Sequence, residues 1–406
     1  MIALERILTF LVLFSLVVKA DGTERHPNVI LILTDDQGSV DVNCYGAEDL
    51  ATPHMDRIAE RGVRFTQFYS AAPVCSPSRA GCLTGCIPQR AGVPGNVGQN
   101  NGLPPEQVTL AEMLRASGYA TAHIGKWHLG HHPSMMPNAQ GFDYSFGHMG
   151  GCIDNYSHFF YWNGPNRHDL WQNGMEIHRS GEFFGDMMVA EATEFIEANR
   201  DRPFFIYYAI NMPHYPYQGD AKWLQHYRDL PYPRNLYAAF LSTVDERIGH
   251  LLTKLDELQL TDETIVILQS DHGHSEEERA HFGGGSSGPY RGHKFDLLEG
   301  GLRVPAMISW PGVLPEGETR DQFATGCDWF PTLATLCNAE IPRHRIDGKD
   351  IVPLIHSSDA TSPHTSFYWE SGGQKCCERE LGNSTSTSQN RRFSTIFPLT
   401  WARQLT

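Results

Sequence analysis

The chain has no excess of positive charge. It contains 32 lysines and arginines against 47 aspartates and glutamates, a formal net charge of −15 over 406 residues. Proteins that bind nucleic acid through its phosphates need clustered lysine and arginine, so the composition excludes a general polyanion binder and predicts no nucleic-acid partner. Any anion must therefore be bound at a local site.

Long apolar runs are missing except near the N-terminus. Residues 7–18 are almost wholly apolar, Arg6 precedes them, and Val18-Lys19-Ala20 ends on the small residue that a signal peptidase needs. The run is shorter than the roughly 20 residues of a membrane-spanning helix, which disfavours the alternative of an N-terminal anchor. We predict a signal peptide at residues 1–20, export to a periplasmic, secreted or lysosome-like compartment, and no membrane span in the mature chain.

Dense cysteine spacing and internal repeats are absent as well. The nine cysteines are scattered and odd in number, which excludes a disulfide scaffold. What remains is the composition of a soluble globular protein, with a length that suits one large α/β domain or two ordinary ones.

Patterns of buried strands alternate with helical patterns along most of the chain. The strand patterns lie at Asn28–Thr34 and at residues 63–69, 119–124, 203–210 and 264–269. The helical patterns lie at residues 54–61, 110–117, 186–199, 236–258 and 328–338. This order predicts an α/β fold with a mostly parallel central sheet and helices on both faces.

Polar residues follow the ends of the predicted strands. They are Asp35, Asp36, Lys126, His128, His214, Asp271 and His272. Ligands of such sheets bind beyond the carboxyl ends of the strands, so we expect these side chains to meet at one edge. The three carboxylates are hard ligands of the type that Ca²⁺ or Mg²⁺ prefers. Taken alone, Asp35-Asp36 could instead cap a turn, and each lysine could be a solvated surface charge.

A short stretch after the second predicted strand carries the most specific pattern, Cys75-Ser76-Pro77-Ser78-Arg79 followed by Leu83-Thr84-Gly85. Taken alone, it is a proline turn before a core helix, with the cysteine as a small buried hydrophobe. Five further motifs accompany it: Asp35-Asp36, Gly125 to Gly130, Pro213-His214, Ser270-Asp271-His272-Gly273, and Lys294 with Glu299-Gly300-Gly301. Jointly they resemble the type I, formylglycine-dependent sulfatases of the alkaline phosphatase superfamily, over about residues 28 to 351. The resemblance is greatest to the N-acetylgalactosamine-6-sulfatase and arylsulfatase group.

The resemblance implies hydrolysis of sulfate monoesters, with a sulfated sugar or an aryl sulfate as substrate. A formylglycine-generating enzyme would oxidise Cys75 to formylglycine, whose hydrated aldehyde would attack sulfur. One divalent metal, by resemblance Ca²⁺, would be held by Asp35, Asp36, Cys75, Asp271 and His272. The family often has asparagine at the position of His272, so the choice of metal stays open between Ca²⁺ and related ions.

The catalytic residues implied by the resemblance complete the set. Lys126 and Lys294 would hold the sulfate oxygens, and Arg79 would hold the diol and its turn. We assign His128 as the base for sulfate release. His214 is then a candidate acid for the leaving alcohol, a role that Lys294 could share or replace.

The chain is predicted to divide near residue 355. Residues 21–355 would form the catalytic domain, and residues 356–406 an incomplete or irregular C-terminal subdomain. Phe367-Tyr368-Trp369 begins a strand that the following residues do not develop, and the residues beyond Gln374 show no periodicity. This pattern suggests a truncated or frame-shifted end.

Two other functions stay open at this point. The first is a phosphodiesterase or phosphonate monoester hydrolase, because related folds use the same aldehyde and a similar metal on phosphorus. The second is an inactive protein that binds sulfated glycans without turnover.

Overall fold

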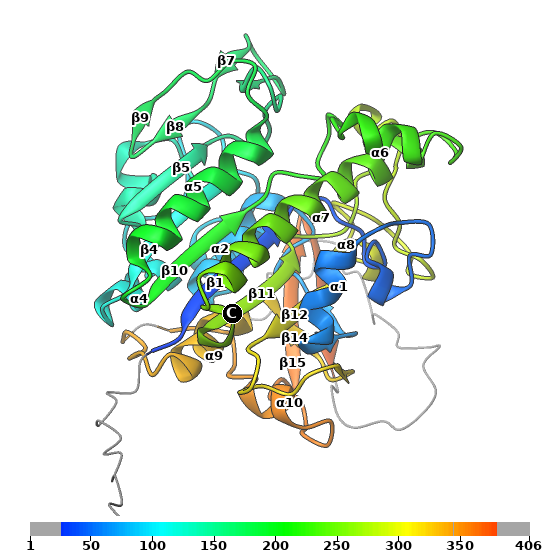
Figure 1. The fold of residues 1–406 in the computed structure, drawn as a ribbon. Coiled ribbons are helices and arrows are strands. Elements are labelled where there is room, and N and C mark those ends of the chain that lie inside the picture. The colour runs from blue at the N-terminus through cyan, green and yellow to red at the C-terminus, as the bar shows by residue number, and fades with distance from the viewer. Residues whose placement is uncertain (1–25, 344, 380–406) are drawn as a thin grey trace, which may run out of the picture.

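The computed structural model describes residues 26–343 and 345–379, so the predicted signal peptide lies outside the described residues. At its centre is a ten-stranded sheet with the order β13-β2-β12-β11-β1-β10-β4-β5-β8-β9 (Figure 1). In this order the strands are Glu318–Arg320, Gly62–Phe65, Ala306–Ser309, Thr264–Ser270, Asn28–Thr34, Phe204–Ala209, Ala120–Lys126, Tyr144–His148, Trp171–Gln172 and Met175–Glu176. Within the described ranges, no helix has the length and apolar character needed to cross a bilayer.

The middle of the sheet is parallel. Strands β11, β1, β10, β4 and β5 run in the same direction, and the antiparallel pairs involve β12 on one side and β8 on the other. Strand β1 is paired on both sides and buried over its whole length. A strand covered on both faces needs apolar side chains at every position, which explains its continuous aliphatic sequence. The predicted fold class, a mostly parallel α/β sheet, is confirmed.

Successive side chains of β1 point into two different cores. Val29, Leu31 and Leu33 belong to the core that includes side chains of α2, α4 and α9, whereas Ile30 and Ile32 belong to the core of α1, α5 and α7. Because neighbouring side chains of a strand lie on opposite faces, the two groups of helices cover opposite faces of the sheet, and α1, α5 and α7 share one face in Figure 1. The helices are α1 Pro53–Glu60, α2 Cys75–Thr84, α3 Pro88–Ala91, α4 Leu110–Ala116, α5 Phe184–Asn199, α6 Ala221–His226, α7 Arg234–Glu257, α8 Glu299–Leu302, α9 Trp329–Leu336 and α10 Val352–His356.

The expected single strand at residues 63–69 is wrong, because the chain leaves the central sheet in the middle of it. After β2 the backbone N–H of Thr66 donates to the carbonyl of Arg320 (2.8 Å). The chain then forms β3 (Phe68–Tyr69), which pairs with β14 (Ala324–Thr325) in a separate small sheet. This turn directs the chain toward helix α2.

The expectation that nothing develops the strand at Phe367 is also wrong. β15 (Ser366–Ser371) pairs with β16 (Gln374–Arg379) in an antiparallel hairpin. Its turn is Gly372-Gly373, both with positive φ (55° and 83°), which is the conformation that two-residue hairpins favour. Phe367 and Trp369 pack into a third apolar core beside Tyr69. The rest of the predicted irregular tail, residues 380–406, lies outside the described residues.

Candidate active site

Cys75 is the first residue of helix α2. Pro77 is compatible with this position, because a backbone N–H in the first turn has no partner within the helix. Ser76 fixes the turn: its backbone N–H donates to Asn96 Oδ1 (3.0 Å), and its hydroxyl accepts from the Val97 N–H (3.1 Å). The thiol is thereby held in a buried position, with Cys75 only 2% exposed.

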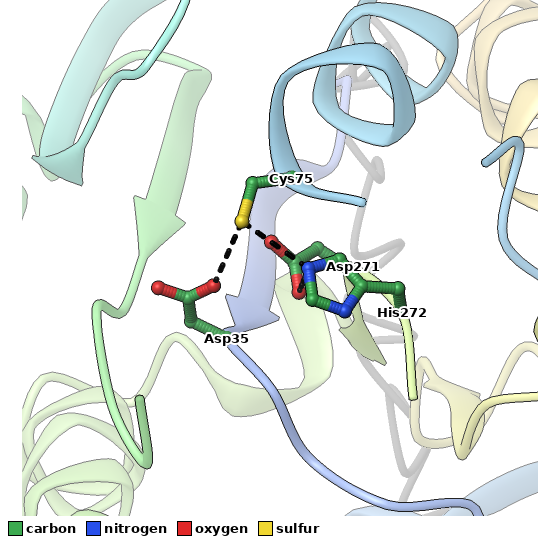
Figure 2. Close-up of side chains that lie close together, drawn as sticks. All are labelled: Asp35, Cys75, Asp271 and His272. Atoms are coloured by element: carbon green, nitrogen blue, oxygen red, sulfur yellow. Dashed lines mark hydrogen bonds and ion pairs between the residues drawn. The ribbon is translucent and has the colours of Figure 1, made fainter. Parts of the chain in front are cut away.

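Four side chains converge beside this helix end, and their donor atoms all lie within 4.8 Å of one another. They are Asp35, Cys75, Asp271 and His272 (Figure 2). Asp35 follows β1, while Asp271 and His272 follow the neighbouring strand β11. Cys75 Sγ lies 3.2 Å from His272 Nε2 and 3.7 Å from Asp35 Oδ1. Two adjacent parallel strands and one helix therefore build a buried cluster of four potential ligands.

Asp36 lies against this cluster. Its Oδ1 is 3.4 Å from His272 Nε2, and its backbone N–H donates to Asp271 Oδ1 (3.3 Å). Oδ1 is also 3.1 Å from Lys294 Nζ, but among the described residues this buried oxygen has no contact with hydrogen-bond geometry. Asp36 has φ 61°, a left-handed conformation that costs a non-glycine residue about 1 kcal/mol or more.

These residues fit a divalent cation. Asp35, Asp36 and Asp271 supply hard carboxylate oxygens, and Asp36 Oδ1, which has no hydrogen bond among the described residues, is the kind of buried oxygen that a cation satisfies. His272 Nδ1 lies 2.9 Å from the Gly273 carbonyl, which can only accept, so Nδ1 carries the proton and Nε2 is left to face the cluster. Burial raises the pKa of Asp36 to about 7 and that of Asp271 to about 6, so the carboxylates are costly to charge without a cation.

Lys126 and Arg79 neutralise part of this negative charge from behind. Lys126 is the last residue of β4, and its Nζ donates to Asp35 Oδ2 at 2.6 Å. Arg79 donates to Asp271 Oδ2 through Nε (3.1 Å) and Nη2 (2.9 Å), and to the Lys126 carbonyl through Nη1 (3.1 Å). Burial would raise the pKa of Asp35, but the charge of Lys126 and its neighbouring cations outweighs burial and holds that pKa well below its usual range. Both cations are fully buried, so their direct partners are the carboxylates and backbone of the site.

Lys294 lies nearer to the reaction space. Its Nζ is 3.1 Å from Asp36 Oδ2 and 3.2 Å from Glu277 Oε2. Sequence reasoning missed Glu277, which also accepts from the Tyr215 hydroxyl (2.9 Å). Its place shortly after β11 was a usable signal, but it stands within three consecutive glutamates, and such a run is usually a solvated surface. Burial would lower the pKa of Lys294, yet Asp36 raises it well above its usual range, so the side chain stays charged.

The surroundings of Cys75 strongly change the pKa of its thiol. Burial would raise its pKa, but Lys126 and Lys294 outweigh burial and lower it to about 6. The pKa of His272 shifts upward instead: burial would lower it, but Asp271 and Cys75 raise it to about 9. At neutral pH the unmodified site therefore holds a thiolate beside an imidazolium, which is a reactive form of cysteine.

His214 follows β10 and faces the carboxylates. Its Nδ1 is 2.8 Å from the Tyr215 carbonyl and must donate to it, so Nε2 is directed toward Asp36 Oδ2, 3.7 Å away. Burial, followed by the charge of Lys294, lowers the pKa of His214 well below its usual range. The imidazole is therefore neutral near pH 7, and its Nε2 can accept a hydrogen bond but has no proton to donate.

His128 has a strained backbone conformation at the beginning of the loop after β4. It has φ 53°, and its Nδ1 has no hydrogen-bond partner in the described part of the chain. Gly151 packs against its ring so closely that a Cβ there would lie 2.7 Å from His128 Cε1. Burial, followed by Lys126, lowers the pKa of His128 well below its usual range, which leaves the ring neutral and able to accept a proton.

A cavity of about 670 Å³ opens on this cluster, a size typical of small-ligand sites. Its catalytic side is lined by Cys75, His128, His214 and Lys294, whereas Lys126 and Arg79 do not line it. The opposing wall comes from the hairpin of β6 (Phe159–Phe160) and β7 (Arg167–His168) and from its loop. The residues of that wall are Phe160, Trp162, Asn163, Gly164, Pro165, Asn166 and Arg167.

The structure brings all ten residues predicted for the site to one edge of the sheet. Lys126 and Arg79 are buried, and each donates to a carboxylate of the cluster, while their contacts with the sulfate and the diol stay predictions. Lys294 is the one predicted lysine that lines the cavity.

Comparisons with known proteins give one consistent result. A model of the family named Sulfatase matches residues 27–339. Human arylsulfatase A is 36% identical, over 86% of this chain and 71% of its own. N-acetylgalactosamine-6-sulfatase of Canis lupus familiaris is 33% identical, over 88% of this chain and 71% of its own. Among solved structures, Ps i-CgsB in complex with k-i-k-neocarrahexaose superposes with a TM-score of 0.80 and 28% identity, covering 88% of this chain and 83% of that chain.

Proposed function

The chain belongs to the sulfatase family and hydrolyses sulfate monoesters, and on this basis we propose its nucleophile, its metal and its class of substrate. The substrate would be a sulfated carbohydrate, and the nucleophile would be formylglycine made from Cys75. The observation that carries this proposal is the position of Cys75, at the start of α2 and on the wall of the cavity, beside three buried carboxylates.

Formylglycine in place of Cys75 would supply a hydrated aldehyde, with one hydroxyl to attack sulfur and a second that allows sulfate to leave. A formylglycine-generating enzyme would be the maturation partner. The chain's own contribution is to hold this side chain at the first turn of α2, where Ser76 and Asn96 fix the backbone.

The metal would be Ca²⁺, held by Asp35, Asp36, Asp271 and His272 together with the side chain at position 75. Three carboxylates favour a hard cation, and the single imidazole nitrogen is compatible with one. When bound, the ion would supply positive charge that polarises the sulfuryl oxygens and lowers the pKa of the attacking hydroxyl. Lys126 and Arg79 would act on these ligands, since each donates to one of the carboxylates.

Proton transfer would be divided between two sides of the cavity. His128 is neutral and lines the cavity, so it can take a proton from the side chain at position 75. Lys294 is better suited than His214 to donate toward the leaving oxygen, because its ammonium is charged and lines the cavity whereas the His214 imidazole is neutral. His214 would then position the ester oxygen beside Lys294.

The substrate proposal rests on the lining of the cavity. Phe160, Trp162 and Tyr215 contribute aromatic rings, and Asn96 and Gln99 contribute amides, to one cavity. Aromatic faces with a few placed polar groups suit a ring that is apolar on its face and hydroxylated at its rim. The names of the relatives point the same way, with an N-acetylgalactosamine-6-sulfatase and a complex with k-i-k-neocarrahexaose among them.

The domain limits and the location belong to the same proposal. Residues 1–20 would direct export to a periplasmic, secreted or lysosome-like compartment. Residues 21–355 would form the catalytic domain, and residues 356–406 would form a smaller C-terminal part that includes the β15–β16 hairpin.

The test is sulfate release by protein co-expressed with a formylglycine-generating enzyme. Substrates are a 6-sulfated N-acetylgalactosamine, an aryl sulfate, and the matching phosphate and phosphonate esters. Cys75→Ala should lower sulfate release by at least about a thousandfold, as loss of a nucleophile does. Cys82→Ala, which changes a buried cysteine of the same helix outside the cavity, is the matched control and should retain activity.

The other outcomes identify the alternatives. Faster turnover of the phosphorus esters than of the sulfates would favour a phosphodiesterase or phosphonate hydrolase. Glycan binding without turnover, by protein whose Cys75 is verified as the aldehyde, would favour a glycan-binding role. Equal activity in Cys75→Ala and wild-type protein would refute the proposed nucleophile.

A further inference from the structure

A second group of metal-binding side chains lies outside the catalytic centre, on the segment that forms the cavity wall. His168, Glu176 and His178 each offer a donor atom, and these atoms all lie within 4.8 Å of one another. His168 ends strand β7, Glu176 ends strand β9, and His178 follows two residues later. The proposed reaction uses none of the three.

The three side chains already lie close together. His168 Nδ1 is 2.9 Å from Glu176 Oε1, and the ring centroids of His168 and His178 are 4.2 Å apart. The side chain of His168 is 9% exposed and that of Glu176 is 41% exposed, so one ligand is held by its surroundings while the others leave access for an ion. The nearest arginine in sequence, Arg179, pairs with Glu182, and Glu176 is left to the histidines.

Backbone pairing fixes the positions of the ligands. Strands β8 and β9 form a tight hairpin in which Trp171 pairs with Glu176. Its turn residues, Asn173 and Gly174, both have positive φ (50° and 76°), as a two-residue hairpin favours. His168 is placed independently, by the pairing of β7 with Phe159 of β6. Two hairpins thus meet at the cluster.

We propose that His168, Glu176 and His178 bind a divalent transition metal of the zinc type, with water in the remaining position. Two imidazole nitrogens and one carboxylate oxygen are a typical ligand set for Zn²⁺, whereas the catalytic cluster, with three carboxylates, suits a harder ion.

The site has a structural consequence for the cavity. His168 directly follows Arg167, which lines the cavity, and the β6–β7 loop before it forms the opposing wall. Glu176 belongs to β9, the outermost strand of the central sheet. A metal that bridges these residues therefore ties the wall of the cavity to the sheet.

The test is titration of Zn²⁺, and of Co²⁺ as a spectroscopic probe, into tag-free protein saturated with Ca²⁺. Calorimetry should show one additional site, and Co²⁺ should give the visible absorption of a four-coordinate complex. Glu176→Gln and His178→Ala should each weaken binding at least about tenfold, because each removes one of three protein ligands. His250→Ala removes an exposed histidine of α7 and should change nothing.

Amide hydrogen exchange tests the bridging. Zn²⁺ should slow exchange in residues 159–168 of the wild-type protein and not in His178→Ala. The proposal is overturned if Ca²⁺-saturated protein binds no Zn²⁺ or Co²⁺, if both ligand variants bind as the wild type does, or if exchange in the hairpin is unchanged by the metal. None of these measurements requires turnover, so failure here is distinguishable from failure of the proposed catalytic site.

Discussion

Calcium binding to the unconverted protein, in which residue 75 is still cysteine, should release about one proton near pH 7.5. The reason is His272, whose pKa burial would lower but Asp271 and Cys75 raise to about 9. Its Nε2 is the atom proposed to bind the ion, and Nδ1 is committed to the Gly273 carbonyl, so the proton on Nε2 must leave. Asp36 releases only a fraction of a proton at this pH, because its pKa of about 7 leaves its carboxyl group mostly ionised.

The raised pKa of His272 sets the direction and the size of the pH dependence of calcium binding and of stability. One released proton makes calcium affinity rise about tenfold, or about 1.4 kcal/mol, for each pH unit up to about pH 9. In the metal-free protein, a pKa raised from 6.5 to about 9 stabilises the fold fully below pH 6.5, and the contribution is lost as the pH rises through 9. That contribution is about 3 kcal/mol. Removal of calcium should therefore destabilise the protein most at alkaline pH.

Two measurements check this. Isothermal titration calorimetry of Ca²⁺ binding in two buffers of different ionisation enthalpy gives the number of protons released. Thermal unfolding in EDTA and in Ca²⁺, from about pH 6.5 to about pH 9, gives the stability difference and its dependence on pH.

His272→Asn is the matched control, since it installs the residue that the family often carries. It keeps the three carboxylates and should release fewer protons than the wild type near pH 8.5, where the carboxylates are mostly ionised but the His272 imidazolium of the wild type is not yet lost. Buffer-independent binding heats in the wild-type protein, or equal proton release in His272→Asn, would refute the reasoning that His272 is a protonated ligand of this site.

Two further changes test a catalytic and a structural contact. Gly151→Ala places a Cβ 2.7 Å from His128 Cε1 and so displaces the imidazole ring. We expect kcat to fall about a hundredfold, with little change in melting temperature. A kcat within a few fold of the wild-type value would show that His128 has no catalytic role. Trp369→Ala deletes a side chain that is 1% exposed and donates to the Ser70 carbonyl (2.9 Å), so the free energy of unfolding should fall by about 3–5 kcal/mol in denaturant titration. An unchanged unfolding midpoint would show that the β15–β16 hairpin is not part of the folded core.

The fold class and the meeting of the site residues could be predicted because both depend on strand register. β1 and β11 pair Thr34 with Ser270, so the residues that follow them, Asp35 and Asp271, must be neighbours. A sequence that shows two buried strands ending in carboxylates already contains this information. The family recognised from the motif at Cys75 is confirmed by the match over residues 27–339.

The sequence could not predict features whose positions do not depend on strand register. Glu277 reaches Lys294 from a loop after β11, and its acidic neighbours gave it the appearance of a surface residue. The hairpin at the end of the described chain depends on Gly372-Gly373, a turn signal that was present but was outweighed by the irregular sequence beyond it. The position of Lys126 after a strand shows which edge of the sheet it occupies, but not that its ammonium is buried against Asp35.

The same distinction explains why the reaction is easier to infer than the sugar. The carboxylates are fixed by the pairing of central strands, which tolerates little change, and the nucleophile lies beside them at the start of α2. The opposing wall, by contrast, comes from one local hairpin, residues 159–168, whose two strands pair only with each other among the described residues. Insertions or substitutions there would alter Trp162 or Arg167 without moving Cys75. Selectivity for a particular sugar can therefore change while the chemistry stays constant, and the proposed metal at His168 would act on that variable half of the site.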